Sequence, residues 1–126
     1  MRSSDVHQQK YRFEDTYNGN MSQEFVKVAT VQDIPEGKLK TVEVGSEKVV
    51  IANVGGKFYA IGATCTHQGW DLSEGMLEGE TIVCAGHGSR WDLKTGQGKF
   101  VRPLLPEPVF DVKVVGADIV VKKKSL

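Results

Sequence analysis

Short apolar runs separated by turn residues dominate the chain from Phe25 onward. Valine, isoleucine, phenylalanine and tyrosine recur in runs of five to seven residues, as expected for strands. In the run Val109–Val115, Phe110, Val112 and Val114 alternate with charged side chains, which is typical of a half-buried strand. Six strands are predicted: Phe25–Thr30, Leu39–Val44, Lys48–Ala52, Lys57–Ile61, Val109–Val115 and Asp118–Lys122.

The residues between these runs predict antiparallel hairpins. Gly45-Ser46-Glu47, Asn53-Val54-Gly55-Gly56 and Gly116-Ala117 contain glycines that can adopt the positive φ of tight turns. Val31–Gly37 includes Asp33-Ile34-Pro35 and is expected to form a helical turn or loop. Because the sequence predicts no long helix, the chain is expected to be all-β, with an antiparallel β-sandwich or barrel framework.

The segment 62–108 has a different character. Eight of the 14 glycines lie between Gly62 and Gly98, and three of the four prolines lie between Pro103 and Pro108. Packed strands alone are not expected to hold such a segment together, whereas a metal centre would supply cross-links. We therefore expect an inserted, metal-stapled subdomain within one domain of residues 25–126, preceded by a flexible tail of residues 1–24.

The composition indicates which classes of partner and which cellular location to expect. The 126 residues carry 16 basic and 16 acidic side chains, so no basic excess points to nucleic acid. No apolar stretch approaches the roughly 20 residues that cross a bilayer, and the first residues lack the apolar segment of a secretory signal. A cytoplasmic protein without a membrane or nucleic-acid partner is expected.

Both cysteines and two of the three histidines fall in two short runs, Cys65-Thr66-His67 and Cys84-Ala85-Gly86-His87. Two thiolates and two imidazoles can hold either zinc or a [2Fe–2S] cluster. A disulfide would close a loop of about 18 residues and contribute roughly 3 kcal/mol. It would leave the paired histidines unexplained, and metal binding is favoured in a reducing cytoplasm. His7, in the polar tail, is expected to have no role.

The two runs and their flanks closely resemble the Rieske [2Fe–2S] family, whose pattern is C-x-H followed by C-x-x-H. The resemblance extends from about Phe25 to Lys122. It includes the glycine after the second histidine, the aromatic-Asp-x-x-Thr-Gly turn that begins at Trp91, and the proline-rich loop Pro103–Pro108. The resemblance implies a Rieske-like fold with one [2Fe–2S] cluster per chain. Its expected ligands are Cys65 and Cys84 on the buried iron and His67 and His87 on the outer iron.

The resemblance also implies which residues surround the cluster. Ser89 occupies the position of a serine that donates a hydrogen bond toward a bridging sulfide. Trp91 stands where high-potential members have a tyrosine, and it has no hydroxyl to offer. High-potential members also have an extra cysteine pair, which this chain lacks, so a potential of roughly −150 to +100 mV is expected. Trp70 either covers the cluster or belongs to the core. The expected neighbours of the cluster are Gly69, Trp70, Ser89, Trp91, Pro103 and Pro106.

The expected function is a soluble, monomeric one-electron carrier between a reductase and a terminal oxygenase or other oxidoreductase. The chain itself is not expected to be an enzyme, because no ligands remain for a two-His, one-carboxylate iron site. One alternative is a small Rieske subunit of a larger complex, such as a nitrite-reductase-like assembly. A structural zinc module is the remote alternative.

Overall fold

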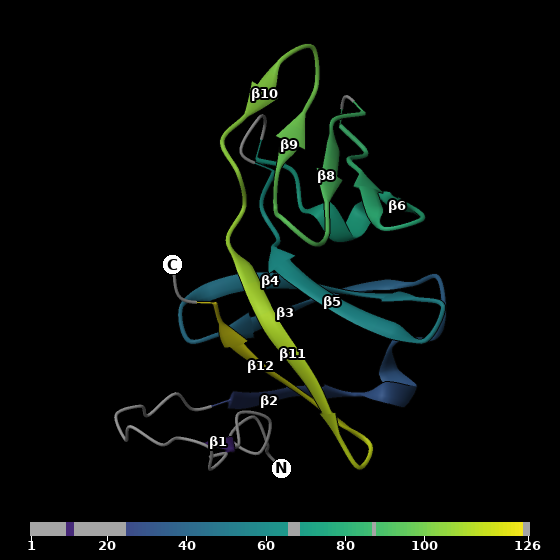
Figure 1. Ribbon diagram of the computed structural model, residues 1–126, viewed down its shortest axis with the longest axis vertical. Coiled ribbons are helices and arrows are strands. Elements are labelled where there is room, and N and C mark those ends of the chain that lie inside the picture. Colours follow the sequence, from purple (N-terminus) through teal and green to yellow (C-terminus); the bar gives the residue numbers. More distant parts are fainter. Residues whose placement is uncertain (1–9, 12–24, 66–68, 87, 125–126) are drawn as a thin grey trace.

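Two antiparallel sheets make up the fold of the computed structural model, which describes residues 10–11, 25–65, 69–86 and 88–124 (Figure 1). The larger sheet contains β1 (Lys10–Tyr11), β2 (Phe25–Thr30), β3 (Leu39–Val44), β4 (Glu47–Val54), β5 (Lys57–Gly62), β11 (Val109–Val115) and β12 (Asp118–Lys123). The smaller sheet contains β6 (Met76–Glu78), β7 (Thr81–Val83), β8 (Arg90–Asp92), β9 (Gly98–Lys99) and β10 (Pro103–Leu104). Two 3₁₀ turns complete the described elements, η2 (Val31–Asp33) and η3 (Leu72–Glu74).

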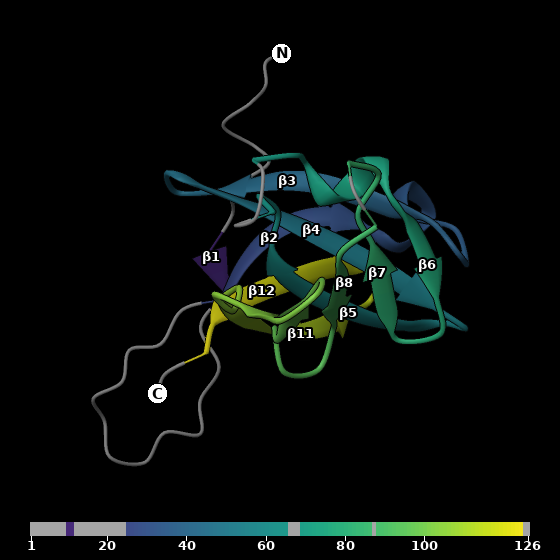
Figure 2. The same cartoon turned by 90° about the horizontal axis from the view of Figure 1, so that it is seen from above.

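The larger sheet has the order β1-β2-β12-β11-β5-β4-β3, and the smaller has the order β10-β9-β8-β7-β6. Strands β2 and β3 also contact each other, so the larger sheet curls into a nearly closed barrel (Figure 2). The prediction of an all-β antiparallel framework with an inserted subdomain is therefore confirmed. No helix in the described ranges is long and apolar enough to cross a membrane.

The six predicted strands are all present. Strands β2, β3 and β11 match their predicted bounds, whereas β4, β5 and β12 are longer. Strand β4 continues through Asn53 and Val54, which remain paired with β5, so that Gly55 and Gly56 alone make the turn. Both glycines have positive φ, 62° and 96°, as the hairpin prediction required.

Asn53 connects this turn to another part of the barrel. Its side-chain oxygen accepts a hydrogen bond from the Gly56 N–H at 2.8 Å, and its amide nitrogen donates to the Ile34 carbonyl at 2.8 Å. Ile34 follows η2, where the sequence predicted a helical turn or loop. One buried amide therefore fixes the β4–β5 turn against the β2–β3 connection.

Strand β1 was not predicted. Lys10 and Tyr11 pair with Val26 and Phe25 at the edge of β2, inside the segment 1–24 that was expected to be a flexible tail. That expectation is wrong for these two residues, because edge pairing uses backbone groups and needs no apolar pattern. The other residues of the expected tail lie outside the described ranges.

Strand β4 supports the small sheet because both of its faces are buried. Val49 and Ile51 point into the barrel, whereas Val50 and Ala52 point to the second core under the small sheet. The buried residues of that second core are Val50, Ala52, Ile61, Ala63, Cys65, Leu72, Ile82, Cys84, Trp91 and Leu93. The segment 62–108 thus has strands and apolar packing of its own, in addition to any metal, and the sequence did not predict this sheet.

Candidate metal centre

The loop that begins at Cys65 is closed by two backbone hydrogen bonds. The Cys65 N–H donates to the Trp70 carbonyl at 2.8 Å, and the Gly69 N–H donates back to the Cys65 carbonyl at 2.7 Å. Gly69 has a φ of 78°, which the other residue types rarely adopt. Gly69 was expected beside the cluster, and its visible role is to reverse the chain within this loop.

The second cysteine loop is built in the same way. The Cys84 N–H donates to the Ser89 carbonyl at 2.8 Å, and the Gly88 N–H donates to the Cys84 carbonyl at 3.0 Å. Gly88 has a φ of 81°. In each loop the fourth residue after the cysteine is a left-handed glycine and the fifth residue closes the loop. This similarity was not predicted, although the spacing Cys-x-x-x-Gly is visible twice in the sequence.

The two thiols are buried and lie in one core. Cys65 is 1 % exposed and Cys84 is 3 % exposed, and both are free cysteines in the structure, not a disulfide. The Gly86 N–H donates to the Cys84 sulfur at 3.4 Å, and the Ser89 Oγ lies 3.6 Å from the Cys65 sulfur. Hydrogen bonds from such neighbouring donors stabilise the negative charge of a metal-bound thiolate. The chemistry of these two donors therefore fits the buried half of a mixed cysteine–histidine metal site.

The other two expected ligands, His67 and His87, lie outside the described residues. Within the described ranges no group of three or more metal-binding side chains occurs. The four-ligand assignment therefore stays a prediction.

Trp91 makes a hydrogen bond that the sequence analysis missed. Its ring is fully buried, and its Nε1–H donates to the Ser89 Oγ at 3.1 Å. The expectation that Trp91 has no hydroxyl is correct, but its indole N–H is a donor. The available signal was the spacing, since side chains two residues apart in an extended segment point to the same side.

Trp70 lies on the surface at the second cysteine loop. Its side chain is 43 % exposed, so the interpretation of Trp70 as a core residue is wrong. A methyl group at Gly86 would come within 2.6 Å of its indole ring, which shows that the ring lies against that backbone. Trp70 therefore bridges the two cysteine loops from outside.

The proline-rich loop contributes Leu104 to the core that contains both cysteines, and the placement of Pro103 and Pro106 beside the cluster stays a prediction. Pro103 and Pro106 are exposed, whereas Leu104 between them packs against the core that contains both cysteines. Glu107 is buried, and its backbone N–H donates to the Gly96 carbonyl at 2.8 Å, which anchors the loop. Burial of an acidic residue here had no signal in the sequence.

Asp71 fastens the first cysteine loop to the barrel. Its Oδ1 accepts hydrogen bonds from the Thr41 hydroxyl at 2.6 Å, the Ser73 hydroxyl at 2.8 Å and the Ser73 N–H at 2.9 Å. Burial raises the pKa of Asp71, but the hydrogen bonds from Thr41 and Ser73 outweigh it, so that the pKa is lowered overall. Asp71 is therefore held as a carboxylate directly after Trp70.

This arrangement predicts a contribution of Asp71 to stability that depends on pH. Because its folded pKa is lowered, the contribution is complete above the unfolded pKa of about 4 and is lost as the pH falls through the folded value. At pH 7 we expect Thr41→Val to lower the free energy of unfolding by about 1.5–3 kcal/mol, because it removes one hydrogen bond to a charged group. Denaturant unfolding of wild type and Asp71→Asn at pH 7 and pH 3 should show their difference shrinking at pH 3. An unchanged difference would contradict this role.

A second fastening joins the turn between β6 and β7 to the barrel. The Tyr59 hydroxyl donates to Glu80 Oε2 at 2.7 Å, and Lys94 lies 3.0 Å from Glu80 Oε1. The hydrogen bond from Tyr59, followed by that from Lys94, lowers the pKa of Glu80. The first cysteine loop is thus tied to strand β3, and the β6–β7 turn of the small sheet is tied to strand β5.

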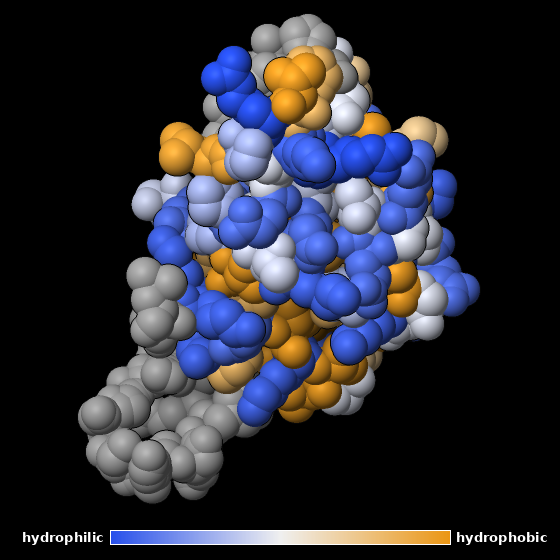
Figure 3. Space-filling model, turned by 45° about the horizontal axis from the view of Figure 1, so that its top comes forward, coloured by the Kyte–Doolittle hydropathy of each residue, from blue (hydrophilic) through white to orange (hydrophobic). Residues whose placement is uncertain are grey.

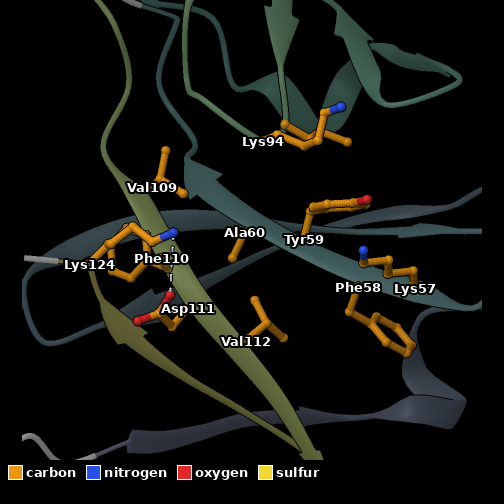
Figure 4. Close-up of a pocket in the computed structure, with 11 residues that line it drawn as sticks. Lys57, Phe58, Tyr59, Ala60, Lys94, Val109, Phe110, Asp111, Val112 and Lys124 are labelled. Atoms are coloured by element: carbon orange, nitrogen blue, oxygen red, sulfur yellow. Dashed lines mark ion pairs between the residues drawn. The ribbon is translucent and has the colours of Figure 1, made fainter.

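A pocket of about 260 Å³ lies near this second fastening, between β5 and β11 (Figure 4). The two strands pair only through Val109↔Ile61 and Phe110↔Ala60 and then diverge. The Lys124 ammonium at the pocket is 3.6 Å from the Asp111 carboxylate. None of the lining residues belongs to either cysteine loop, so this pocket is separate from the candidate metal centre.

Comparison with known families decides what kind of centre the two loops form. The model of the Rieske [2Fe-2S] domain matches residues 24–115, which include both loops and the whole small sheet. The chain belongs to the Rieske [2Fe-2S] family. The family carries one [2Fe–2S] cluster, so the predicted cofactor is confirmed.

Relatives of this Rieske protein include electron-transfer components of oxygenase systems. It is 36 % identical over 95 residues to the ferredoxin component of biphenyl 2,3-dioxygenase from Rhodococcus jostii, covering 75 % of this chain and 89 % of the relative. It is also similar to a chain in the complex of oxygenase and ferredoxin of carbazole 1,9a-dioxygenase, with a TM-score of 0.74 and 34 % identity over 83 % of this chain and 100 % of that chain. The carbazole 1,9a-dioxygenase ferredoxin of Nocardioides aromaticivorans gives a TM-score of 0.73 at 31 % identity, over 79 % and 98 % of the two chains.

Proposed function

We propose that this Rieske protein carries single electrons from a reductase to a terminal oxygenase in the cytoplasm. The observation that carries the proposal is the extent of the match. The chain covers 89 % of a biphenyl dioxygenase ferredoxin and 98 % of a carbazole dioxygenase ferredoxin, but only 30 % of a carbazole dioxygenase terminal oxygenase. The carrier, which transfers electrons and performs no catalysis itself, is the better-matched role.

We assign Cys65 and Cys84 to the buried iron and His67 and His87 to the outer iron. When bound, a Rieske cluster supplies a one-electron couple whose potential lies above that of an all-thiolate cluster, because two neutral imidazoles replace two thiolates. This chain buries both thiols in an apolar core and supplies a hydrogen-bond donor to the Cys84 sulfur and a hydroxyl near the Cys65 sulfur. These residues exclude water and offset thiolate charge at the inner side of the site.

The end of the molecule that carries the two cysteine loops has an exposed apolar surface. The β9–β10 hairpin protrudes at this end (Figure 1), and orange hydrophobic surface is seen there in Figure 3. Val101 at the hairpin turn is 78 % exposed and Leu105 is 73 % exposed, with Arg102 also exposed beside them. Exposed apolar patches with a polar rim commonly mark protein-interaction sites. We assign this hairpin to the surface that meets the oxygenase.

A negative charge at this surface should slow electron transfer. We expect Val101→Asp to weaken docking about tenfold, because desolvating an unpaired carboxylate costs roughly 1–3 kcal/mol. The control is Val114→Asp, since Val114 is also an exposed valine, 47 % exposed, but lies on β11 in the barrel. Stopped-flow transfer rates at several oxygenase concentrations measure the effect. Equal losses in both variants, with the potential unchanged, would contradict the assignment of this surface.

The carrier function is tested with the reduced protein and a defined acceptor. Coulometric titration should show one electron taken up reversibly per chain. Anaerobic mixing of the reduced protein with the oxidised oxygenase component of the Rhodococcus jostii biphenyl 2,3-dioxygenase system should restore the oxidised visible spectrum, at a rate proportional to the oxygenase concentration. Isolation from its own cells only in fixed stoichiometry with a large catalytic chain would contradict the carrier and support the subunit alternative.

A further inference from the structure

The hydrogen bonds at Ser89 have a direction that the donor chemistry determines. An indole N–H can only donate, so the bond of 3.1 Å from Trp91 Nε1 must use a lone pair of the Ser89 Oγ. The single hydroxyl proton of Ser89 is then available for another acceptor. The Cys65 sulfur lies 3.6 Å from the same Oγ, and as a metal-bound thiolate it has no proton to give. The order is therefore Trp91 to Ser89 to Cys65, and the Cys65 sulfur takes the place of the bridging sulfide that the family resemblance implied as the acceptor of the Ser89 proton.

The packing around Trp91 holds its N–H in this direction. Ser89 directly precedes strand β8, and its side chain is buried together with that of Trp91, whereas Arg90 between them is exposed and lies 2.8 Å from Glu78. Gly98 is the cross-strand partner of Trp91, and even a methyl group there would overlap the six-membered ring of the indole. The ring is therefore held against the β9 backbone and has no room to turn.

We propose that Trp91 sets the reduction potential of the cluster through Ser89, as a positioning residue that never touches the iron. Reduction adds one negative charge to the cluster and its thiolates, so a hydrogen bond donated to the Cys65 sulfur stabilises the reduced form and raises the potential. A hydroxyl that accepts one hydrogen bond becomes a stronger donor in the next. Ser89 and Trp91 are both fully buried, where water does not weaken these bonds.

This inference rests on the proposed cluster ligands. It gives Trp91 an indirect effect on the cluster, whereas the sequence analysis noted only that the side chain has no hydroxyl. The tryptophan supplies no hydroxyl of its own, yet it commits the hydroxyl of Ser89 to the sulfur. A phenylalanine at position 91 would fill much of the same space but would leave the Ser89 proton free to choose another acceptor. The distinguishing group is thus one N–H.

The test compares midpoint potentials of proteins that contain equal amounts of iron and sulfide. We expect Trp91→Phe to lower the equilibrium constant for reduction about threefold to tenfold, a fall of about 30–60 mV at 59 mV per tenfold for a one-electron couple. Ser89→Ala should lower it at least as far. In the Ser89→Ala background, Trp91→Phe should cause no further fall, because its only route to the sulfur is gone. Tyr59→Phe, which removes a donor to Glu80 instead, should leave the potential unchanged.

The outcomes separate the possible failures. An unchanged potential in Trp91→Phe, or an equal fall with and without Ser89, would overturn the proposal and assign Trp91 to packing. A wild-type protein without iron and sulfide would instead refute the proposed function. If Trp91→Phe does not fold, 3-benzothienylalanine at position 91 keeps the two-ring shape and lacks only the N–H. It should then show the same fall in potential.

Discussion

Alanine at any of Cys65, His67, Cys84 or His87 should leave the purified protein without its [2Fe–2S] cluster. Each position supplies one of four expected bonds, and the loss of one ligand opens the site to water and to hydrolysis. Because metal binding also stabilises the domain, we expect the melting temperature to fall in all four variants. Iron and sulfide analysis, the visible spectrum and thermal unfolding measure these losses.

The third histidine provides a matched control. His7→Ala removes an imidazole from the same chain, outside both expected ligand runs. It should retain full iron and sulfide content and the wild-type spectrum. A variant at His67 or His87 that kept its cluster as well as His7→Ala does would contradict the ligand assignment.

Gly98→Ala should be among the most damaging single changes in the small sheet. The added methyl group would overlap the Trp91 ring, which is fully buried and cannot move into solvent. Overpacking of this kind costs about 1–3 kcal/mol and sometimes more, and we expect the upper end here. Denaturant unfolding measures the change. The control is Gly79→Ala, at a φ of 60° with open space around it, where about 1 kcal/mol of backbone strain is expected.

A double-mutant cycle identifies the cause. Trp91→Phe removes part of the ring that the new methyl group would meet, so Gly98→Ala should cost clearly less in that background. If the cost of Gly98→Ala were the same with tryptophan and phenylalanine at position 91, the ring contact would not be its origin.

The barrel was predictable from the sequence because its strands are long enough to show a pattern. Val109–Val115 alternates over seven residues, and turns such as Gly55-Gly56 mark where hairpins reverse. The small sheet was not predictable, because its strands are only two or three residues long. A run as short as Gly98–Lys99 cannot display a period of two. Its place in the sheet depends on tertiary contacts that the local sequence does not encode.

The site was predictable in its chemistry and only partly in its surroundings. The short spacings from Cys65 and Cys84 to the histidines that follow them indicated a [2Fe–2S] cluster, and the family match confirmed this cofactor. The hydrogen bond from Thr41 to Asp71 joins residues 30 apart in sequence, and no local pattern signals such a contact. The bond from Trp91 to Ser89 is local, but a buried tryptophan is expected to pack, and only the structure shows where its N–H points.

The ligand set itself is the central claim, and electron paramagnetic resonance of the dithionite-reduced protein tests it most directly. Protein labelled with ¹⁵N-histidine should give the signal of a reduced [2Fe–2S] cluster with a lower average g value than an all-thiolate cluster. Its hyperfine couplings should report two histidine nitrogens and change on labelling. A colourless protein that binds only zinc, or a cluster signal without nitrogen coupling, would contradict ligation by two cysteines and two histidines.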